Sequence, residues 1–402
     1  MKPVTKKPYA IVLGLDHMNG LQTARILAQR GVPVIGVVKD RKHYCARTNV
    51  CERIIVEDNN TEKYLSDLES LGQLLEEKAV LVPCLDPKVK FISENRDRLE
   101  KWFHIVLPSK EKVETLMNKF QFYKYAMENN IPIPNTRFLN SKEDMEQAAQ
   151  ELRFPCVVKP PMRNEEWNKL GGSKAYKVNT PHELFELYEK LKPWSDILII
   201  QEWVSGDETS LYSCNCYFNN QGEPLVTFVA RKLRQWPPIT GESSLGEEVR
   251  NDFVLEETVK LFEGIGYYGL GYVEFKKDDR TGDHYIIEPN IGRPTGRSSI
   301  AEAGGVELLY TMYCDVVGLP LPENRVQKYT GVKWLGIRRD LQSAFFYWRQ
   351  GKLTIKEYFQ SIKGPKGYAL YSRSDLGPFI GDLIRSVKLV LSRSRNRIRN
   401  KR

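Results

Sequence analysis

The sequence lacks several patterns that would place it in a common class of protein. No uninterrupted apolar run reaches the length of about 18 residues that a membrane-spanning helix requires. The seven cysteines include no C-x-x-C pair, and no cluster of His and Cys offers the ligands of a zinc site. The turn 14–20 reads G-L-D-H-M-N-G, which lacks the G-x-G-x-x-G spacing of dinucleotide-binding proteins. We therefore expect neither a membrane-spanning helix nor a zinc or dinucleotide site.

The composition is that of a folded chain. Hydrophobic residues make up 41% of the 402 residues and aromatic ones 11%, which excludes disorder throughout. A chain of this length suggests two or three packed units. Because the cysteines are odd in number and several lie in apolar runs, we expect small buried thiols in a reducing compartment. The sequence thus predicts a cytoplasmic protein.

Positive charge is concentrated at the C-terminus. The net charge is +9, but the segment 385–402 holds eight Lys and Arg residues and no acid, which leaves the rest of the chain at +1. Such a balanced body is not typical of nucleic-acid-binding proteins, so we expect no nucleic-acid partner.

Two interpretations of this tail stay open. If residues 383–402 are helical, Leu383, Val387, Val390 and Leu391 form one apolar stripe beside the basic residues. That arrangement is typical of a helix at an anionic membrane surface and predicts peripheral contact with the inner face of the membrane. The charge density of the last ten residues equally suits a solvated, disordered end.

The first part of the chain alternates strand and helix signals. Residues 9–14 and 33–38 are short apolar runs, and the segment 20–30 between them is amphipathic. A further apolar run at 79–84 repeats the pattern. This alternation predicts a parallel sheet with helices on its faces. Strand-like runs after residue 196, among them LYSCNCYF, PLVTFVARKLRQW, LGYVEFKK and HYIIEPN, predict an antiparallel sheet.

Charged residues inside these apolar runs point to a site. Lys159 follows the buried run 155–158, and a buried ammonium requires an anionic partner. Glu274 lies in GYVEF, while Glu288 and Asn290 lie one hairpin later and share a face of their strand, because side chains alternate along a strand. Two carboxylates and one amide oxygen suit Mg²⁺, a hard cation that also binds phosphate oxygens.

The order of these motifs resembles that of the ATP-grasp superfamily. NKFQFYKYAMENNIPIPNT is similar to the helix that carries an early lysine and leads into P-x-P-x-T, FPCVVKP to the strand with the phosphate-binding lysine, and G-G-S to the mobile glycine loop. QEWVSGDE is similar to the hinge strand, and YVEF with YIIEPN to the metal strands. The match covers about residues 110–310, and the chain looks most like the predicted carboxylate–amine ligases, which also carry an R-K-x-R-Q-x-P-P-like segment.

The resemblance implies roles for particular residues. It implies that the backbone of the hinge binds adenine and that Glu208 binds the ribose of ATP. The residues expected to contact ATP are Lys119, Lys159, Gly172, Ser173, Gln201, Glu202, Trp203, Val204 and Glu208. It implies that Glu274, Glu288 and Asn290 bind Mg²⁺, with two ions expected and Mn²⁺ able to substitute. The family usually has an arginine two residues after the metal-binding asparagine, where this chain has Gly292. We expect Arg293, or alternatively Arg297, to take that catalytic role.

A second basic segment is expected to bind substrate. Arg231, Lys232 and Arg234 lie in VARKLRQWPP, and three cations between apolar residues favour anion binding over a surface charge run. We expect Arg231 and Lys232 to act in catalysis and Arg234 to bind the substrate. The turn 16–19 is also a candidate for substrate contact, because the ends of parallel strands line the cleft in such sheets.

The fold class implied is α/β followed by α+β, with an N-terminal parallel-sheet domain before a two-lobed ATP-grasp fold. The expected divisions are a pre-ATP-grasp domain at 1–108, an ATP-grasp domain at 109–320 with a small lobe at about 120–205 and a central lobe at about 206–320, a mixed region at 321–384 and the basic tail at 385–402.

The function implied is an ADP-forming ligase that joins a small-molecule carboxylate to an amine through an acylphosphate. A carboxylase that activates bicarbonate at the same site is an alternative, and since the chain contains no biotin-carrier segment, its carrier would be a separate protein. A nucleotide-binding regulator without turnover is a further alternative, which the presence of all three candidate metal ligands disfavours. The residues that select the substrates lie on loops, so the sequence does not identify the substrates.

Overall fold

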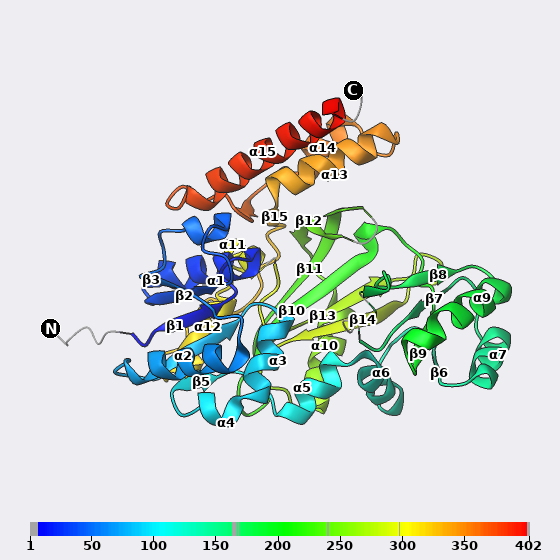
Figure 1. The fold of residues 1–402 in the computed structure, drawn as a ribbon, viewed down its shortest axis with the longest axis horizontal. Helices are drawn as coiled ribbons and strands as arrows, with labels where there is room; N and C mark the ends of the chain where they lie inside the picture. Colours follow the sequence, from blue (N-terminus) through cyan, green and yellow to red (C-terminus); the bar gives the residue numbers. More distant parts are fainter. Residues whose placement is uncertain (1–6, 163–166, 168, 239–240, 297, 400–402) are drawn as a thin grey trace.

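The structure is a computed structural model that describes residues 7–162, 167, 169–238, 241–296 and 298–399. Figure 1 shows an N-terminal α/β domain in blue, a small green lobe at the opposite end, and a large sheet between them. A layer of C-terminal helices, in orange and red, lies along one side of this arrangement.

The N-terminal domain is a five-stranded parallel sheet with strand order β3-β2-β1-β4-β5. Its elements are β1 (Ala10–Leu13), α1 (Met18–Gln29), β2 (Val34–Val38), η1 (Tyr44–Arg47), β3 (Arg53–Val56), α2 (Thr61–Gln73), β4 (Ala79–Pro83), α3 (Asp86–Glu94), α4 (Arg96–Leu99) and β5 (Phe103–Ile105). The three inner strands, β2, β1 and β4, are buried along their whole length, as expected where helices cover both faces. The parallel sheet predicted from the sequence is confirmed.

The small lobe is a four-stranded antiparallel sheet with strand order β6-β9-β7-β8. Two helices, α5 (Lys110–Met117) and α6 (Lys119–Glu128), lead into it. The lobe consists of β6 (Thr136–Leu139), α7 (Lys142–Glu151), β7 (Cys156–Lys159), β8 (Tyr176–Val178), α9 (Pro181–Leu191), η2 (Lys192–Trp194) and β9 (Leu198–Glu202). Lys159 is the last residue of β7, so the strand brings it to the edge of the lobe.

The large sheet has seven strands in the order β14-β13-β10-β11-β12-β15-β16. It is built from η3 (Glu208–Ser210), β10 (Leu211–Phe218), β11 (Pro224–Trp236), β12 (Glu242–Glu248), β13 (Gly269–Lys277), β14 (His284–Ile291), β15 (Lys333–Leu335) and β16 (Lys366–Tyr368). The helices α10 (Asp252–Gly264), α11 (Ser298–Ala303) and α12 (Leu308–Val316) accompany it. The four strands predicted from the sequence form antiparallel pairs β10·β11, β10·β13 and β13·β14. Two strands after residue 320 extend the sheet.

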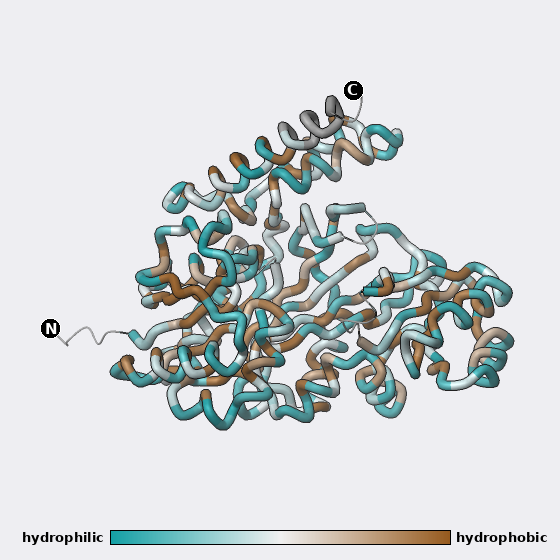
Figure 2. The backbone as a smooth tube through the Cα atoms, in the orientation of Figure 1, coloured by the Kyte–Doolittle hydropathy of each residue, from teal (hydrophilic) through white to brown (hydrophobic). Residues whose placement is uncertain are grey.

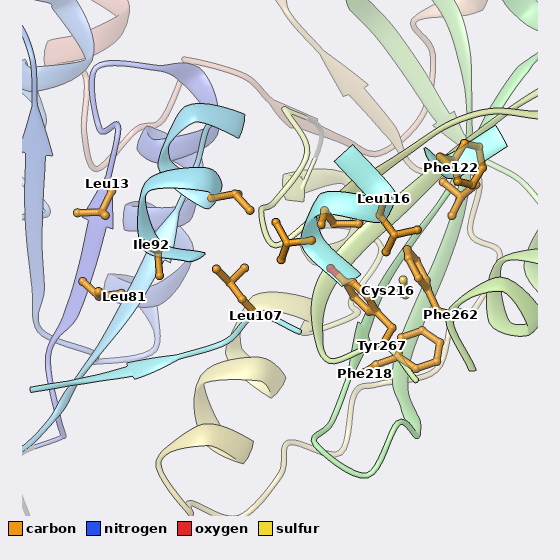
Figure 3. Packing of buried hydrophobic residues seen from close by; sticks show 14 of the residues in the cluster. Leu13, Leu81, Ile92, Leu107, Leu116, Phe122, Cys216, Phe218, Phe262 and Tyr267 are labelled. Atoms are coloured by element: carbon orange, nitrogen blue, oxygen red, sulfur yellow. The ribbon is translucent and has the colours of Figure 1, made fainter. Parts of the chain in front are cut away.

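One hydrophobic core joins the N-terminal domain to the large sheet. Figure 3 shows Leu81 and Ile92 of the N-terminal domain in the same cluster as Phe262 and Tyr267, which pack beside the large sheet. Figure 2 shows the brown, apolar segments running through the strands, with teal segments on the outer turns and helices. Because a continuous core fixes the two sheets against each other, side chains at their junction are held in place.

The C-terminal helices are α13 (Ile337–Arg349), α14 (Ile355–Ser361) and α15 (Gly377–Arg399). Within the described part of the chain, none of the helices has the length and apolar character needed to cross a membrane. The described part of the expected tail, residues 385–399, is the end of α15, which begins eight residues before Arg385.

Candidate active site

A cavity of about 980 Å³ opens where the N-terminal domain, the small lobe and the large sheet meet. The carboxyl ends of β1 and β4 face it, because the residues that follow these strands belong to its lining. This is the position that ligand sites occupy in open parallel sheets. Its polar lining residues include His17, Asn19, Asp86, Lys119, Tyr123, Lys174, Lys232, Gln235, Glu242, Glu274, Glu288, Asn290 and Arg293.

The three candidate metal ligands lie together on the large sheet. Glu274 of β13 pairs directly with Glu288 of β14, and Asn290 lies two residues further along the same strand. All three line the cavity. Among the residues that the structure describes, no three His, Cys, Asp or Glu side chains gather closely enough to hold a metal ion. The possible ligand set is therefore two carboxylates and one amide oxygen, which suits a hard cation such as Mg²⁺.

Lysines surround Glu288. The Lys119 Nζ lies 3.3 Å from the Glu288 Oε2, and Lys119 is the first residue of α6. Burial alone would raise the pKa of Glu288, but the positive charges of Lys119, Lys174 and Lys159 outweigh this effect and lower it. Glu288 is therefore ionised at neutral pH, as a carboxylate ligand of a cation must be.

Lys159 is held by Tyr123, a residue that the sequence analysis did not identify. The Lys159 Nζ donates to the Tyr123 Oη at 2.6 Å, and the Tyr123 hydroxyl donates to the carbonyl of Ile287 at 2.8 Å. Burial, with repulsion from Lys119, lowers the pKa of Lys159 to about 7. A bound anion would favour its charged form. The only sequence signal for Tyr123 is its position four residues after Lys119, which places both on one face of α6.

Arg293 reaches the metal strands despite its displacement by one residue. Its Nη2 donates to the Asn290 Oδ1 at 2.8 Å, and its guanidinium forms an ion pair with Asp86. Gly292 explains the displacement, because its φ is +67° and a Cβ built there would lie 2.2 Å from Leu107. An arginine therefore cannot occupy this position without strain, and the tight turn directs Arg293 back toward the strand.

Arg297, the alternative to Arg293, lies outside the described residues.

The basic run on β11 divides into two groups. Lys232 lines the cavity, where its Nζ donates to the Gln235 Oε1 at 3.0 Å. Arg231 instead pairs with Glu247 at 2.5 Å, and Arg234 makes two 2.8 Å contacts with Asp340 of α13.

The structure therefore brings only one of these three cations to the described lining of the cavity, and irregular pairing of β11 with β12 around Arg234 accounts for the split. The expectation that all three cations bind substrate is therefore not met, because the alternation of side chains along β11 is interrupted.

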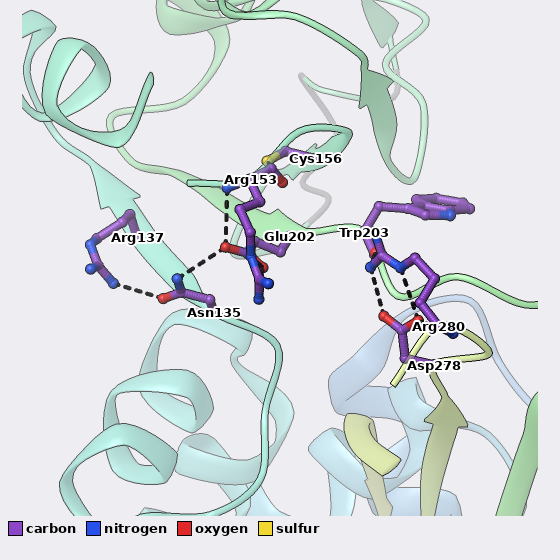
Figure 4. Close-up of polar contacts among 8 residues, drawn as sticks. All are labelled: Asn135, Arg137, Arg153, Cys156, Glu202, Trp203, Asp278 and Arg280. Atoms are coloured by element: carbon purple, nitrogen blue, oxygen red, sulfur yellow. Dashed lines mark hydrogen bonds and ion pairs between the residues drawn. The ribbon is translucent and has the colours of Figure 1, made fainter. Parts of the chain in front are cut away.

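The hinge residues lie at the end of β9, outside the described lining of the cavity. Figure 4 shows the Glu202 carboxylate turned toward Asn135 and Arg153, with hydrogen bonds of 3.2 Å to the side-chain amide and 3.1 Å to the Arg153 backbone. Trp203 donates its backbone N–H to Pro155 at 2.9 Å, and its carbonyl accepts from Arg280 at 2.9 Å. The side chain of Glu202 therefore fixes the hinge rather than facing the cavity.

Two other side chains of the hinge are buried. Gln201 is buried, and its side chain donates to Thr136 at 2.8 Å. Val204 is also buried. Glu208, in η3, accepts hydrogen bonds from Tyr347 of α13 and from Gln235 at 3.5 Å. The expected ribose ligand is thus oriented by a helix more than 130 residues later in the chain.

The glycine loop is ordered around Trp167. The Gly172 N–H donates to the Trp167 carbonyl at 2.8 Å, and the Trp167 indole donates to the Ser173 carbonyl at 3.0 Å. A Cβ on Gly172 would lie 2.3 Å from the indole nitrogen, so only glycine fits there. Ser173 donates its own N–H to the Tyr176 hydroxyl at 2.8 Å.

The N-terminal domain contributes polar groups that the sequence identified only as a turn. Asn19 is buried and donates to the carbonyl of Cys84 at 3.2 Å, while His17 caps α1. Burial lowers the pKa of His17, so the imidazole is neutral at pH 7. Glu242 faces this end of the cavity and pairs with Arg339 of α13.

No family model matches the chain. Its sequence is 27% identical over 238 residues to a D-aspartate ligase of Enterococcus faecium, a match that covers 55% of this chain and 54% of that protein. The chain thus spans about half the length of this relative.

Solved structures show a similar fold over more of the chain. N5-carboxyaminoimidazole synthetase of Staphylococcus aureus superposes with a TM-score of 0.61 and 16% identity, and 78% of each chain is covered. Biotin carboxylase of Campylobacter jejuni superposes with a TM-score of 0.62 and 16% identity over 81% of this chain and 74% of that one. The resemblance that the sequence predicted is confirmed: the chain has the ATP-grasp fold and is related in sequence to ATP-grasp ligases.

Proposed function

We propose that this chain is an ATP-dependent ligase that joins a carboxylate to an amine through an acylphosphate and releases ADP and phosphate. The observation that carries the proposal is the junction cavity, where Glu274, Glu288 and Asn290 meet lysines from two other parts of the fold. A site with both anionic and cationic groups suits Mg²⁺ and a polyphosphate together. The relationship to a D-aspartate ligase supports the reaction class.

We assign the phosphate end of the cavity to ATP. Glu274, Glu288 and Asn290 would hold Mg²⁺, with two ions and substitution by Mn²⁺ as the finer expectation, and the metal would neutralise charge on the phosphates. Lys119 and Lys159 would hold phosphate oxygens, with Tyr123 orienting Lys159.

The remaining nucleotide contacts follow the same assignment. The loop with Gly172 and Ser173 would cover the phosphates, and the backbone of 201–204 would bind adenine. Glu208 would bind the ribose, oriented by its hydrogen bonds from α13 and β11.

The carboxylate substrate would lie beside the metal ligands, because Arg293 of the cavity lining contacts Asn290. A carboxylate oxygen held by Arg293 and Lys232 would attack the γ-phosphorus. The amine would then attack the acyl carbon and displace phosphate, with the same cations stabilising the oxyanion. Arg231 and Arg234 are not needed, because neither belongs to the described lining of the cavity.

The test is the release of ADP with acids and amines supplied separately and together. D-aspartate is the first acid to try, because the sequence relative is a D-aspartate ligase. A ligase requires both substrates for sustained ADP release, whereas a carboxylase would respond to bicarbonate and a regulator would respond to neither. Turnover with bicarbonate in place of both substrates would overturn the proposal.

The finer expectation for location is peripheral contact with the inner membrane surface through the basic end of α15. We propose this contact on the charge of the segment 385–402.

A further inference from the structure

The three C-terminal helices each expose an apolar stripe. On α13, Leu341, Phe345 and Trp348 recur at intervals of four and three residues, and each is more than half exposed. This spacing places them on one side of the helix. Monomeric proteins rarely leave a large apolar patch open to water without a function for it.

The other two helices continue the pattern. Ile355 and Phe359 of α14 are 66% and 63% exposed and lie four residues apart. On α15 the exposed apolar residues that share one side of the helix are Ile380, Leu383, Ile384 and Val387. We call these nine residues of α13, α14 and α15 the apolar face. Figure 1 shows the three helices side by side as one layer, and Figure 2 shows apolar segments along this layer.

The layer is anchored to the rest of the molecule by its polar side. Asp340 of α13 pairs with Arg234 of the large sheet, and Arg339 of α13 pairs with Glu242 of β12. Within the layer, Arg338 of α13 pairs with Asp382 of α15 at 2.7 Å. Because the buried pair of Asp340 with Arg234 fixes one side of α13 against the large sheet, the exposed apolar residues of α13 lie on its other sides.

Charge distinguishes this surface from the rest of the chain. Residues 337–402 contain 16 Lys and Arg but only 4 Asp and Glu, a net charge of +12, whereas residues 1–336 carry −3. Three of these four acids, all within the described residues, are buried in ion pairs or hydrogen bonds, namely Asp340, Asp375 and Asp382. Exposed basic residues accompany the apolar face on the three helices and between α13 and α14, among them Arg349, Lys352, Lys356, Arg385 and Lys388.

This combination selects among possible occupants. A second copy of the chain would bring its own +12 region against this one, and like charges oppose such association. Exposed Trp and Phe with aliphatic residues, flanked by long basic side chains, are typical of helices that lie in the interface of an anionic bilayer. We propose that the apolar face docks the protein on an anionic membrane surface, with α13 and α14 contributing as well as α15.

The proposal goes beyond the ligase activity and is tested without substrates. Sedimentation with vesicles of phosphatidylcholine containing phosphatidylglycerol should bring the full chain into the pellet at low salt. Pure phosphatidylcholine vesicles should not, because only an anionic surface attracts the basic residues. Binding should weaken at high salt, since the attraction is screened. Equal binding to both vesicles, or none to either, would overturn the proposal; in the second case a protein is the occupant.

Substitutions in the apolar face distinguish its contribution to vesicle binding from that of the basic end of α15. Phe345→Ser together with Trp348→Ser should reduce the fraction of bound protein at least tenfold. Val326→Ser, which changes an exposed apolar residue outside the face, should leave it unchanged. Circular dichroism and the melting temperature check that each variant is folded. Unchanged binding of a folded double variant would show that the basic segment alone binds and would contradict docking by the apolar face.

Trp348 also reports its own position. With brominated phosphatidylcholine in the anionic vesicles, tryptophan fluorescence of the wild-type protein should be quenched on binding. Trp348→Phe keeps an aromatic side chain, so sedimentation should be retained while most of the quenching is lost. Full quenching in Trp348→Phe would show that another part of the molecule faces the lipid, and would overturn the proposal.

Discussion

Glu288 is the residue on which the nucleotide site depends most. It lies between the metal strands and the lysines, and it pairs with Lys119 at 3.3 Å. Glu288→Gln keeps its size but removes the negative charge that a divalent cation and the lysines both require. We expect turnover to fall by on the order of a hundredfold or more at saturating Mg²⁺, as for other lost charge stabilisation in transfer reactions.

The measurement is steady-state ADP release with Glu256→Gln as a control, because Glu256 is an exposed acid on α10. Wild-type turnover in a folded Glu288→Gln protein would contradict the metal assignment.

Glu302 provides a pH-dependent prediction outside the site. Burial, opposed by Arg30 and assisted by Glu307, raises the pKa of Glu302 to about 8 from an ordinary value of 4.5. Between these values the unfolded chain has lost the proton while the folded chain keeps it. The unfolded state therefore binds fewer protons, and the free energy of unfolding falls as the pH rises through this window.

Glu302→Gln should abolish this dependence of stability on pH. The melting temperature of the variant minus that of the wild type should therefore increase between pH 5 and pH 8. A difference between the two proteins that stays constant or shrinks over this range would show that Glu302 is ionised in the folded protein.

At the scale of elements, α13 connects the C-terminal layer to the site. Its inner side holds Arg234 through Asp340, pairs with Glu242 through Arg339 and orients Glu208 through Tyr347. A single helix therefore reaches both ends of the proposed active site.

We expect the ion pair of Arg234 and Asp340 to stabilise the fold rather than to bind substrate. Both side chains are buried, at 5% and 0% exposure, and Arg234 also lies over the ring of Tyr358. Asp340→Asn would leave the guanidinium without its counter-charge, which typically costs about 3 kcal/mol or more in the free energy of unfolding.

Urea unfolding measures this loss, with Asp283→Asn, an exposed acid in the loop between β13 and β14, as the control. If Asp340→Asn unfolded at the wild-type midpoint but lost substrate-dependent ADP release, Arg234 would belong to the substrate site as the sequence suggested.

The sequence predicts the strands better than it predicts which side chains contact one another. Alternation alone places Glu288 and Asn290 on one face, and the structure adds that Glu274 is the direct partner of Glu288. Partners from distant segments leave no local signal: Asp340 is 106 residues from Arg234, and Tyr123 reads as an ordinary helix aromatic.

At the scale of the whole molecule, the cavity exists because one core joins two sheets of different kinds. The parallel sheet supplies strand ends with His17, Asn19 and Asp86, and the antiparallel sheet supplies the metal strands. Neither sheet alone contains both these polar residues and the metal strands. The sequence predicted the two sheets separately, but their junction depends on the packing of residues such as Leu107 and Tyr267, which no periodicity reveals.

The transfer of oxygen from acid to phosphate tests the central claim most directly. The protein is incubated with Mg²⁺, ATP, amines and amino acids, including D-aspartate, whose carboxylates carry ¹⁸O, and the released phosphate is analysed by mass spectrometry. Attack of a carboxylate oxygen on the γ-phosphorus releases ADP, and displacement by the amine then breaks the bond from the acyl carbon to that oxygen. We predict one ¹⁸O in each phosphate and an absolute requirement for the acid. Unlabelled phosphate released at the same rate without the acid, or formation of AMP and pyrophosphate, would contradict the account.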